Sequence, residues 1–217
     1  MAAKSQASSP KGRADESARG AIMNAAERLF AERGIDAVSL RTINTEAGYS
    51  VAALHYHFGT RDGLVKALLQ RAQPAMFRQR ATMVSALESQ DPPQVEAIVG
   101  ALVYPLTAGM LEHFSESVAQ LRFLVRLSFD RSPYLAKTLD DSVALFRPLL
   151  RRSLPHLDAR TLTRRWLFAA DLAQHALANA LEVHLGATAG GGVPTRAQLE
   201  QFQRDLVAFI SGGLRAP

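Results

Sequence analysis

The stretch AGYSVAALHYHFGTRDGL, residues 47–64, contains a turn and a short helix that together decide the fold. Gly48 is suited to end a preceding helix, because glycine adopts the left-handed conformation of a helix terminus at little cost. Ser50 can cap a second helix, predicted from Val51 to His57. Two helices joined by a glycine-containing turn form a helix-turn-helix arrangement.

The flanking segments complete a small helical module. Apolar residues recur at spacings of three and four, which predicts helices rather than strands. The spacing predicts one helix from Ser17 to Arg33, a short one from Leu40 to Ala47, and a long one from Arg61 to about Glu88, bent near Pro74. The first two would support the helix that follows Ser50.

Beyond residue 90 the helix boundaries are predicted from caps and helix breakers. Asp91 followed by two prolines and Gln94 indicates a helix start. Thr195 with Gln198 has the spacing of a capping box ahead of a final helix. Between them, further helices are expected over about 117–129, 133–154 and 159–185. The chain therefore reads as an all-α protein of about nine helices.

Composition limits the classes of protein that the chain can represent. It has 217 residues, of which 47% are hydrophobic, enough for one sizeable core or two small ones. The absence of cysteine excludes disulfides, zinc-thiolate sites and iron–sulfur clusters. The apolar runs are much shorter than the roughly 20 residues of a membrane span. Residues 1–16 lack the apolar core of a signal peptide and read as a disordered basic tail, so we expect a cytoplasmic protein without a membrane partner.

The positive charge of the chain is unevenly distributed. Residues 1–80 contain 12 Lys and Arg against 7 Asp and Glu, whereas residues 81–217 contain 13 of each class. The formal net charge of +5 therefore belongs to the N-terminal part. A basic module followed by a neutral one is typical of a protein whose first part meets phosphates.

His55 and His57 raise the alternative of a metal or catalytic site. Residues two apart on a helix lie about 200° from each other around its axis, so the two rings cannot bind one ion. We therefore expect no metal site. For His57, two alternatives stay open, which are packing against the first helix and contact with a phosphate. For Tyr56 the sequence favours contact with a phosphate.

The N-terminal segment resembles the DNA-binding domain of the TetR family of bacterial transcriptional regulators over about Ala18 to Leu69. The residues that carry this resemblance are Ala25, Ala26, Leu29, Phe30, Gly34, Ala47, Gly48, Leu54, His57 and Phe58. It implies an all-α homodimer, with a helix-turn-helix domain at 17–62 and a ligand-binding and dimerisation domain at 63–217. Segments in the second half are faintly similar to members that respond to fatty acids or their thioesters.

The resemblance also implies which residues meet double-stranded DNA. The family's DNA-contacting positions are occupied here by Arg41, Thr42, Val51, Ala52, Ala53, His55, Tyr56, His57 and Arg61. His55 departs from the tyrosine, and Arg61 from the lysine, that is most frequent in the family. Leu54 and Phe58 are four apart and should face the core. Because the first turn, Val51–Ala53, has no hydrogen-bonding side chain, base reading there must be apolar or come from Arg41.

The last two helices are expected to form a dimer interface. Small residues on one helix allow close approach, and apolar residues on the other form a coiled-coil-like seam. The residues concerned are Ala169, Ala173, Ala176, Ala180, Phe202, Leu206, Phe209 and Ile210. The alternative is that both stripes belong to the core of one protomer.

A ligand pocket is expected among the helices in between. The candidate lining residues are Phe123, Leu127, Phe146, Trp166, His175 and Asn179. Asp171, His175 and Asn179 form a polar line on an apolar helix, and would need partners in the core, across a dimer or on a ligand. Arg122 with Arg126, and Arg147 with Arg151, are spaced to hold an anion. The ligand predicted is a hydrophobic or amphipathic small molecule.

Together these patterns predict a transcriptional regulator, most simply a repressor that a ligand releases from a palindromic operator. The competing hypothesis is a lipid-binding or enzymatic helical bundle. We find no phosphate loop, nucleophile elbow or metalloprotease motif, and the glycines at 190–192 have no strand context. We therefore expect no enzymatic activity and no cofactor.

Overall fold

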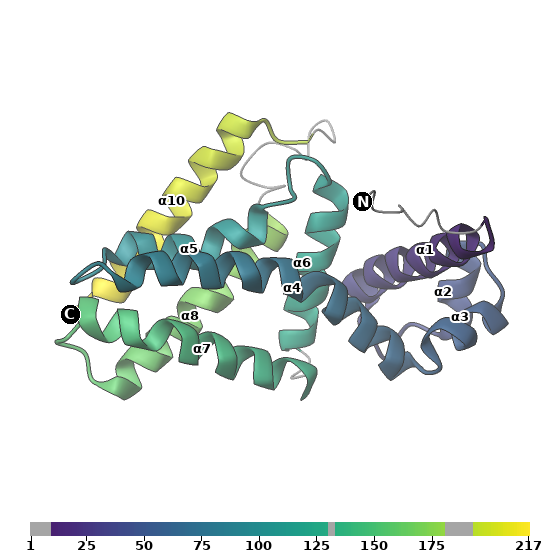
Figure 1. Cartoon of the computed structure of the whole chain (residues 1–217), viewed down its shortest axis with the longest axis horizontal. Coiled ribbons are helices and arrows are strands. Elements are labelled where there is room, and N and C mark those ends of the chain that lie inside the picture. The colour runs from purple at the N-terminus through teal and green to yellow at the C-terminus, as the bar shows by residue number, and fades with distance from the viewer. Residues whose placement is uncertain (1–9, 130–132, 181–192) are drawn as a thin grey trace, which may run out of the picture. The chain divides into compact units, whose positions relative to one another are not determined.

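The computed structural model describes residues 10–129, 133–180 and 193–217. Over these ranges the chain forms nine α-helices and one π-helical segment, without a strand, which confirms the all-α prediction (Figure 1). The chain divides into two compact units, Met1–Arg71 and Ala72–Pro217, so the division falls after Arg71 rather than after residue 62. None of the described helices is long and apolar enough to cross a membrane.

The N-terminal unit consists of three helices and the first part of a fourth. These are α1 (Pro10–Arg33), α2 (Leu40–Ala47), α3 (Val51–Phe58) and α4 (Arg61–Glu88). The prediction that residues 10–16 are disordered is wrong, because α1 begins at Pro10 and not at Ser17. Proline is favoured at the first helical position, and the residues after it tolerate a helix despite their polarity. Residues 1–9 lie outside the described residues.

A single small core holds these helices together. α1 packs against α2 and α3, and α2 packs against α3. Each helix contributes fully buried side chains, among them Ile22, Phe30, Ile43, Leu54 and Leu64. Leu54 is the anchor of α3, and it is completely inaccessible to solvent.

The helix ends around the turn follow the sequence prediction. The Ser39 and Ser50 hydroxyls accept hydrogen bonds from the backbone N–H groups of Thr42 and Ala53, and so cap α2 and α3. Gly48 has a φ of 73°, the left-handed conformation expected of it. The helix-turn-helix geometry is therefore specified locally.

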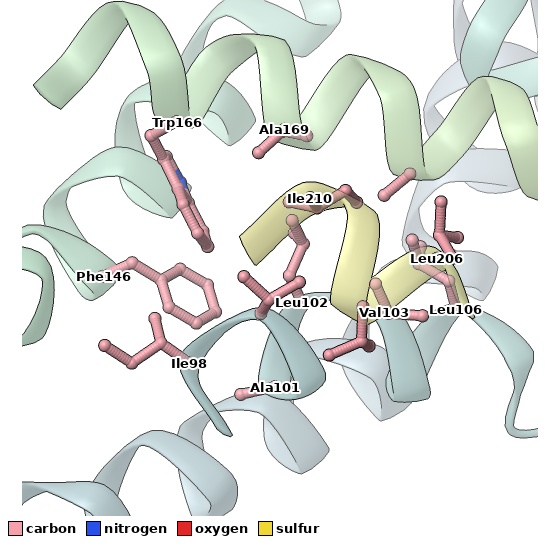
Figure 2. Close-up of a cluster of buried hydrophobic side chains, with 14 of the residues drawn as sticks. Ile98, Ala101, Leu102, Val103, Leu106, Phe146, Trp166, Ala169, Leu206 and Ile210 are labelled. Carbon is pink, nitrogen blue, oxygen red and sulfur yellow. The ribbon is translucent and has the colours of Figure 1, made fainter. Parts of the chain in front are cut away.

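The C-terminal unit contains the rest of α4 and the remaining helices. These are α5 (Val95–Thr107), α6 (Phe114–Phe129), α7 (Pro133–Ser153), α8 (Ala159–His175), the π-helical η1 (Ala176–Ala180) and α10 (Arg196–Arg215). α5 is almost entirely buried and packs against α7, α8 and α10. In the core, the rings of Phe146 and Trp166 lie with centroids 4.5 Å apart beside Leu102 of α5 (Figure 2).

Three helix boundaries in the C-terminal unit differ from the prediction. α6 begins at Phe114 rather than at about residue 117. α5 begins at Val95 and not within the Asp91–Gln94 stretch, because a residue that precedes proline avoids the helical region and Pro92 precedes Pro93. Asp91 instead accepts a hydrogen bond from Arg152 at 3.3 Å. The α-helical part of α8 ends at His175 and continues as η1, while residues 181–185 of the predicted helix lie outside the described residues.

Candidate functional site

The outer face of α3 presents the side chains that the sequence assigns to DNA. Leu54 and Phe58 are buried, as predicted from their spacing. On the other side, Tyr56 is 77% exposed and Val51 is 44% exposed. Ala52 is exposed as well. The face is therefore mainly apolar in its first turn and aromatic in its second.

The supporting helix α2 adds one exposed cation. Arg41 is exposed, whereas Thr42 and Ala53 are half-buried. The Thr42 hydroxyl lies 2.8 Å from the Ser39 hydroxyl, so it takes part in the cap of its own helix. Of these residues, Arg41 is the one that brings charge to the face.

His55 is exposed, and a hydrogen bond sets its tautomer. Its Nδ1 lies 2.7 Å from the carbonyl oxygen of Gly59, which can only accept, so Nδ1 carries the proton. In the neutral ring Nε2 is then an acceptor. A phosphate contact through Nε2 would require the protonated ring.

His57 is turned into the domain. Its side chain is 6% exposed and its Nε2 lies 3.7 Å from Oδ1 of Asp15 on α1. The ring also packs edge-on to Tyr56 and tilted against Phe58. Of the two alternatives for His57, this placement favours packing against α1.

Arg61 is half-buried and holds the backbone of another segment. Its Nη2 donates a hydrogen bond of 2.9 Å to the carbonyl oxygen of Val38, just before α2. The guanidinium therefore ties the start of α4 to the loop between α1 and α2. The remaining N–H groups of its five are still suited to a phosphate.

A buried ion pair braces α1 against the first part of α4. Arg71 donates to Oε2 of Glu27 at 2.6 Å and to Oδ1 of Asn24 at 2.7 Å. The other oxygen of Glu27 has no hydrogen-bond partner among the described residues. Burial raises the pKa of Glu27, and the charge and hydrogen bond of Arg71 oppose that rise.

The predicted ligand-lining residues occupy two different environments. Phe123, Leu127, Phe146 and Trp166 are buried in the packed interior. His175 and Asn179 are exposed, and so is Asp171, whose backbone carbonyl lies 2.9 Å from Nδ1 of His175. The structure thus does not bring the six together, and their role in ligand binding stays a prediction.

A cavity of about 160 Å³ lies elsewhere in the C-terminal unit, between α4, α5 and α6. Its lining residues are Ala75, Met76, Gln79, Pro105, Leu106, Ala108, Gly109, Ser117, Gln120, Leu121 and Leu124. The wall is apolar apart from Gln79, Ser117 and Gln120. The sequence analysis missed this site, although Met76 and Gln79 share one face of the predicted fourth helix.

The residues predicted for the dimer interface also differ in burial. Ala169, Ala173, Leu206 and Ile210 are buried where α8 packs against α10 within one protomer, and Ala176 and Phe202 are half-buried. Phe209 is 72% exposed. Ala180 ends η1, and its side chain lies outside the described residues. The small residues therefore serve the close contact between α8 and α10.

Next to this contact lies an exposed apolar groove, which we call the α8–α10 groove. It has a volume of about 140 Å³ and is lined by Arg165, Phe168, Ala169, Leu172, Phe209, Ile210, Gly213 and Leu214. Phe168 is 63% exposed, and Leu172 is exposed too. The sequence did not indicate Phe168 and Leu172 as candidates for the predicted interface.

Helix-turn-helix geometry with an exposed recognition face defines a DNA-binding regulatory protein. Two family models match the chain, "Bacterial regulatory proteins, tetR family" over residues 22–68 and "Tetracyclin repressor-like, C-terminal domain" over residues 100–213. The chain belongs to the TetR family of bacterial transcriptional regulators.

Named relatives agree with this assignment. The HTH-type transcriptional repressor Rv3405c of Mycobacterium tuberculosis and the HTH-type transcriptional regulator Mb3439c of Mycobacterium bovis are each 30% identical over 157 residues. Each alignment covers 65% of this chain and 79% of the relative. The competing hypothesis of a lipid-binding or enzymatic bundle is not favoured.

Solved structures share the fold at low sequence identity. The probable transcriptional regulatory protein RHA5900 has a TM-score of 0.63 and 19% identity, covering 92% of this chain and 100% of that one. Mycobacterium smegmatis AmtR has a TM-score of 0.56 and 16% identity, covering 100% of this chain and 91% of that one. A γ-butyrolactone receptor described as ArpA-like has a TM-score of 0.54 and 18% identity, covering 91% of this chain and 98% of that one.

Proposed function

We propose that the chain is a homodimeric repressor that binds a palindromic operator through α3 of each protomer and is released by a small hydrophobic or amphipathic molecule. It acts in the cytoplasm, where chromosomal operators lie. The observation that carries the proposal is the outer face of α3, where Val51 and Tyr56 are exposed while Leu54 and Phe58 anchor the helix from behind.

The dimensions of α3 suit the major groove. An α-helix with its side chains is about 10–12 Å across, and the groove is about 12 Å wide. Val51 and Ala52 can pack against thymine methyl groups, and the Tyr56 hydroxyl can bond a phosphate or a base edge. Arg41 supplies a charge beside them, and Arg61 positions the loop while retaining donors for the backbone.

Two protomers are needed for specific binding. One short recognition helix spans few base pairs, and dimers gain affinity by placing two helices about 34 Å apart, one helical turn of DNA. The α8–α10 groove supports a dimer, because Phe168, Leu172 and Phe209 expose apolar surface that a second copy would cover.

The cavity between α4, α5 and α6 is the candidate inducer site. It has a mostly apolar wall with a few amide and hydroxyl groups, the pattern of small-molecule sites. A ligand releases the operator only if it binds a second conformation better than the DNA-bound one. The cavity is thus a second candidate site beside the six lining residues predicted from the sequence.

The experiment is a titration of DNA from the promoter adjacent to the gene, at several salt concentrations, with the wild type and Tyr56→Ala. We expect sequence-dependent binding whose affinity falls steeply with salt, and a loss of roughly 1–3 kcal/mol of binding free energy in the variant. Phe129→Ala removes an equally exposed aromatic residue, also 77%, from α6 and serves as the matched control.

Both variants should unfold like the wild type, because the side chains removed are exposed. Wild-type binding that is indifferent to sequence and salt, or full affinity in Tyr56→Ala, would overturn the proposal.

A further inference from the structure

The cavity between α4, α5 and α6 has an apolar floor and a polar wall. Its buried lining residues have only hydrocarbon side chains, and they are Pro105, Leu106, Leu121 and Leu124. The polar lining residues are more accessible, since Ser117 and Gln120 are half-buried and Gln79 is exposed. A molecule in this cavity would therefore place its apolar part against the floor and its polar part against the wall.

One face of α6 provides both kinds of surface. The lining residues of this helix recur at spacings of three and four, and they are Ser117, Gln120, Leu121 and Leu124. Residues three apart on a helix have Cβ atoms about 5–6 Å from each other. The Ser117 hydroxyl and the Gln120 amide can therefore bind the same small polar group, while the two leucines contact the apolar body attached to it.

The polar groups on this face are available to a ligand. Within the described part of the chain, the side chains of Ser117 and Gln120 make no hydrogen bond. A Cβ atom added at Gly109, another lining residue, would lie 3.2 Å from the Ser117 hydroxyl oxygen. Glycine at position 109 therefore leaves space beside the hydroxyl that any larger residue would restrict.

The described lining contains no Lys, Arg, His, Asp or Glu. An ion that enters an apolar space loses its hydration, and this loss is not recovered without an opposite charge. An amide, ester or hydroxyl group loses less, because hydrogen bonds to Ser117 and Gln120 replace those to water. The lining therefore favours an uncharged ligand over an anion.

The size of the cavity limits what can enter. Its volume of about 160 Å³ is close to that of an apolar protein cavity of roughly 150 Å³ that accommodates benzene. One ring with a short substituent fills such a space, whereas a long acyl chain would leave most of its length outside. The faint similarity to members that respond to fatty acids or their thioesters favours a longer, anionic ligand, so the cavity and that similarity point to different classes of molecule.

We propose that this cavity binds a compact, uncharged molecule whose apolar body packs on Leu106, Leu121 and Leu124 and whose single amide, ester or hydroxyl group hydrogen-bonds to Gln120 and Ser117. The inference rests on the proposed function as a ligand-released repressor and names the chemical class of the ligand. A glutamine amide and a serine hydroxyl each donate and accept hydrogen bonds, so together they suit an uncharged group with either capacity.

The test uses benzamide, which is polar and uncharged, benzoate, which has nearly the same shape and a negative charge, and toluene, which is apolar. Binding to the full-length protein is measured by calorimetry for the wild type, Gln120→Leu and Gln174→Leu. Gln174 is half-buried on α8 and is not among the lining residues, so its variant is the matched control.

We expect the wild type and Gln174→Leu to bind benzamide at least tenfold more tightly than benzoate, because only the anion is left without a counter-charge. Gln120→Leu should lose about fivefold in affinity for benzamide, through loss of a hydrogen bond, and should retain or increase its affinity for toluene. Ser117→Ala should also weaken benzamide binding alone, and it covers the case in which Gln120→Leu does not fold.

The comparison of probes separates hydrogen bonding from a change in the shape of the cavity, which would weaken benzamide and toluene together. Such a parallel loss would overturn the proposal. So would benzoate binding as tight as that of benzamide, no benzamide binding, or undiminished benzamide binding in both variants. Decanoate, a long anion, should not displace benzamide from the wild type, and displacement would overturn the proposed class.

Operator binding by the wild type is measured in the absence of probe. Intact DNA binding together with no benzamide binding would overturn the ligand class alone. Absence of DNA binding would instead overturn the proposed function.

Discussion

Tyr56 and His57 are neighbours in the sequence and lie in opposite environments. Successive residues on a helix are turned by about 100°, so one ring points outward while the other packs between α3 and α1. Tyr56 is 77% exposed, and the His57 side chain is 6% exposed. The sequence predicted the outward position of Tyr56 but left His57 open, because its packing depends on Asp15, which is distant in the chain.

Glu27 gives the N-terminal unit a specific dependence on pH. Its folded-state pKa is raised above 4.5 by burial, so between 4.5 and the raised value the folded state binds more protons than the unfolded state. Where the folded state binds more protons than the unfolded state, the free energy of unfolding decreases as pH increases. Relative to Glu27→Gln, the wild type should lose free energy of unfolding as pH rises through this window, measured by urea unfolding at a series of pH values.

The control for this measurement is Glu32→Gln, at an exposed position of the same helix. The wild type and Glu32→Gln should show the same trend relative to Glu27→Gln. A difference between the wild type and Glu27→Gln that stays constant with pH, or that grows as pH rises, would contradict the assignment.

At the scale of single residues, periodicity predicted the buried side of α3 but not the partners of its charged neighbours. Leu54 and Phe58 follow from a spacing of four. Arg61 was assigned to DNA, and the structure shows that it also holds the carbonyl of Val38, 23 residues away.

Both helices of the helix-turn-helix are short, and their caps matter accordingly. α2 and α3 have eight residues each, fewer than an isolated helix needs to be stable in water. The Ser50 hydroxyl accepts a hydrogen bond from the Ala53 N–H at 3.3 Å. Ser50→Ala should therefore lower the free energy of unfolding by about 1 kcal/mol, measured by chemical denaturation.

Ser50→Asp is the matched variant, because aspartate caps a helix and also favours the positive end of its dipole. It should retain the stability of the wild type. If Ser50→Ala and Ser50→Asp lose the same amount, the hydroxyl is not acting as a cap.

At the scale of helices, the sequence was most informative where the signal is local. Gly48 and the capping box of Thr195 with Gln198 lie where they were predicted. The prediction of a helix start at Asp91 was wrong, because Pro93 keeps Pro92 out of the helical conformation despite the cap pattern. The π-helical segment η1 was not foreseen, and the Nε of Arg122 on α6 donates to its Ala178 carbonyl at 3.0 Å, a contact between helices distant in sequence.

The α8–α10 groove determines the expected assembly of the whole molecule. Phe209 lies in it with 72% of its surface exposed. A charge at this position would lose its hydration in a dimer but would be solvated in a protomer. Phe209→Glu should therefore convert a dimer to a monomer, measured by sedimentation velocity, and should weaken operator binding at least tenfold while helicity is unchanged.

Phe129→Glu introduces the same charge at an exposed phenylalanine of α6, outside the groove, and should leave the assembly unchanged. If Phe209→Glu sediments like the wild type, the groove is not the dimer interface.

At the scale of the molecule, the sequence predicted two functional parts from charge and from the N-terminal resemblance. The sequence placed the domain boundary after residue 62, whereas the compact units of the structure divide after Arg71, within α4. Several of the residues predicted for the dimer interface pack between α8 and α10 within one protomer, and the interface itself stays a prediction. Hydrophobic periodicity marks which helix faces are apolar but not whether the neighbour is the same chain or another copy.

DNA recognition is assigned to the N-terminal unit and dimerisation to the C-terminal unit. A protomer that cannot bind DNA could therefore still dimerise with an intact protomer and inactivate the pair. A mutant allele with an impaired α3 and an unchanged α8–α10 groove would still form mixed pairs with the normal protein. In a cell that expresses both alleles equally, three quarters of random pairs would contain at least one defective copy. Such an allele should be genetically dominant, whereas one that loses Phe209 should be recessive.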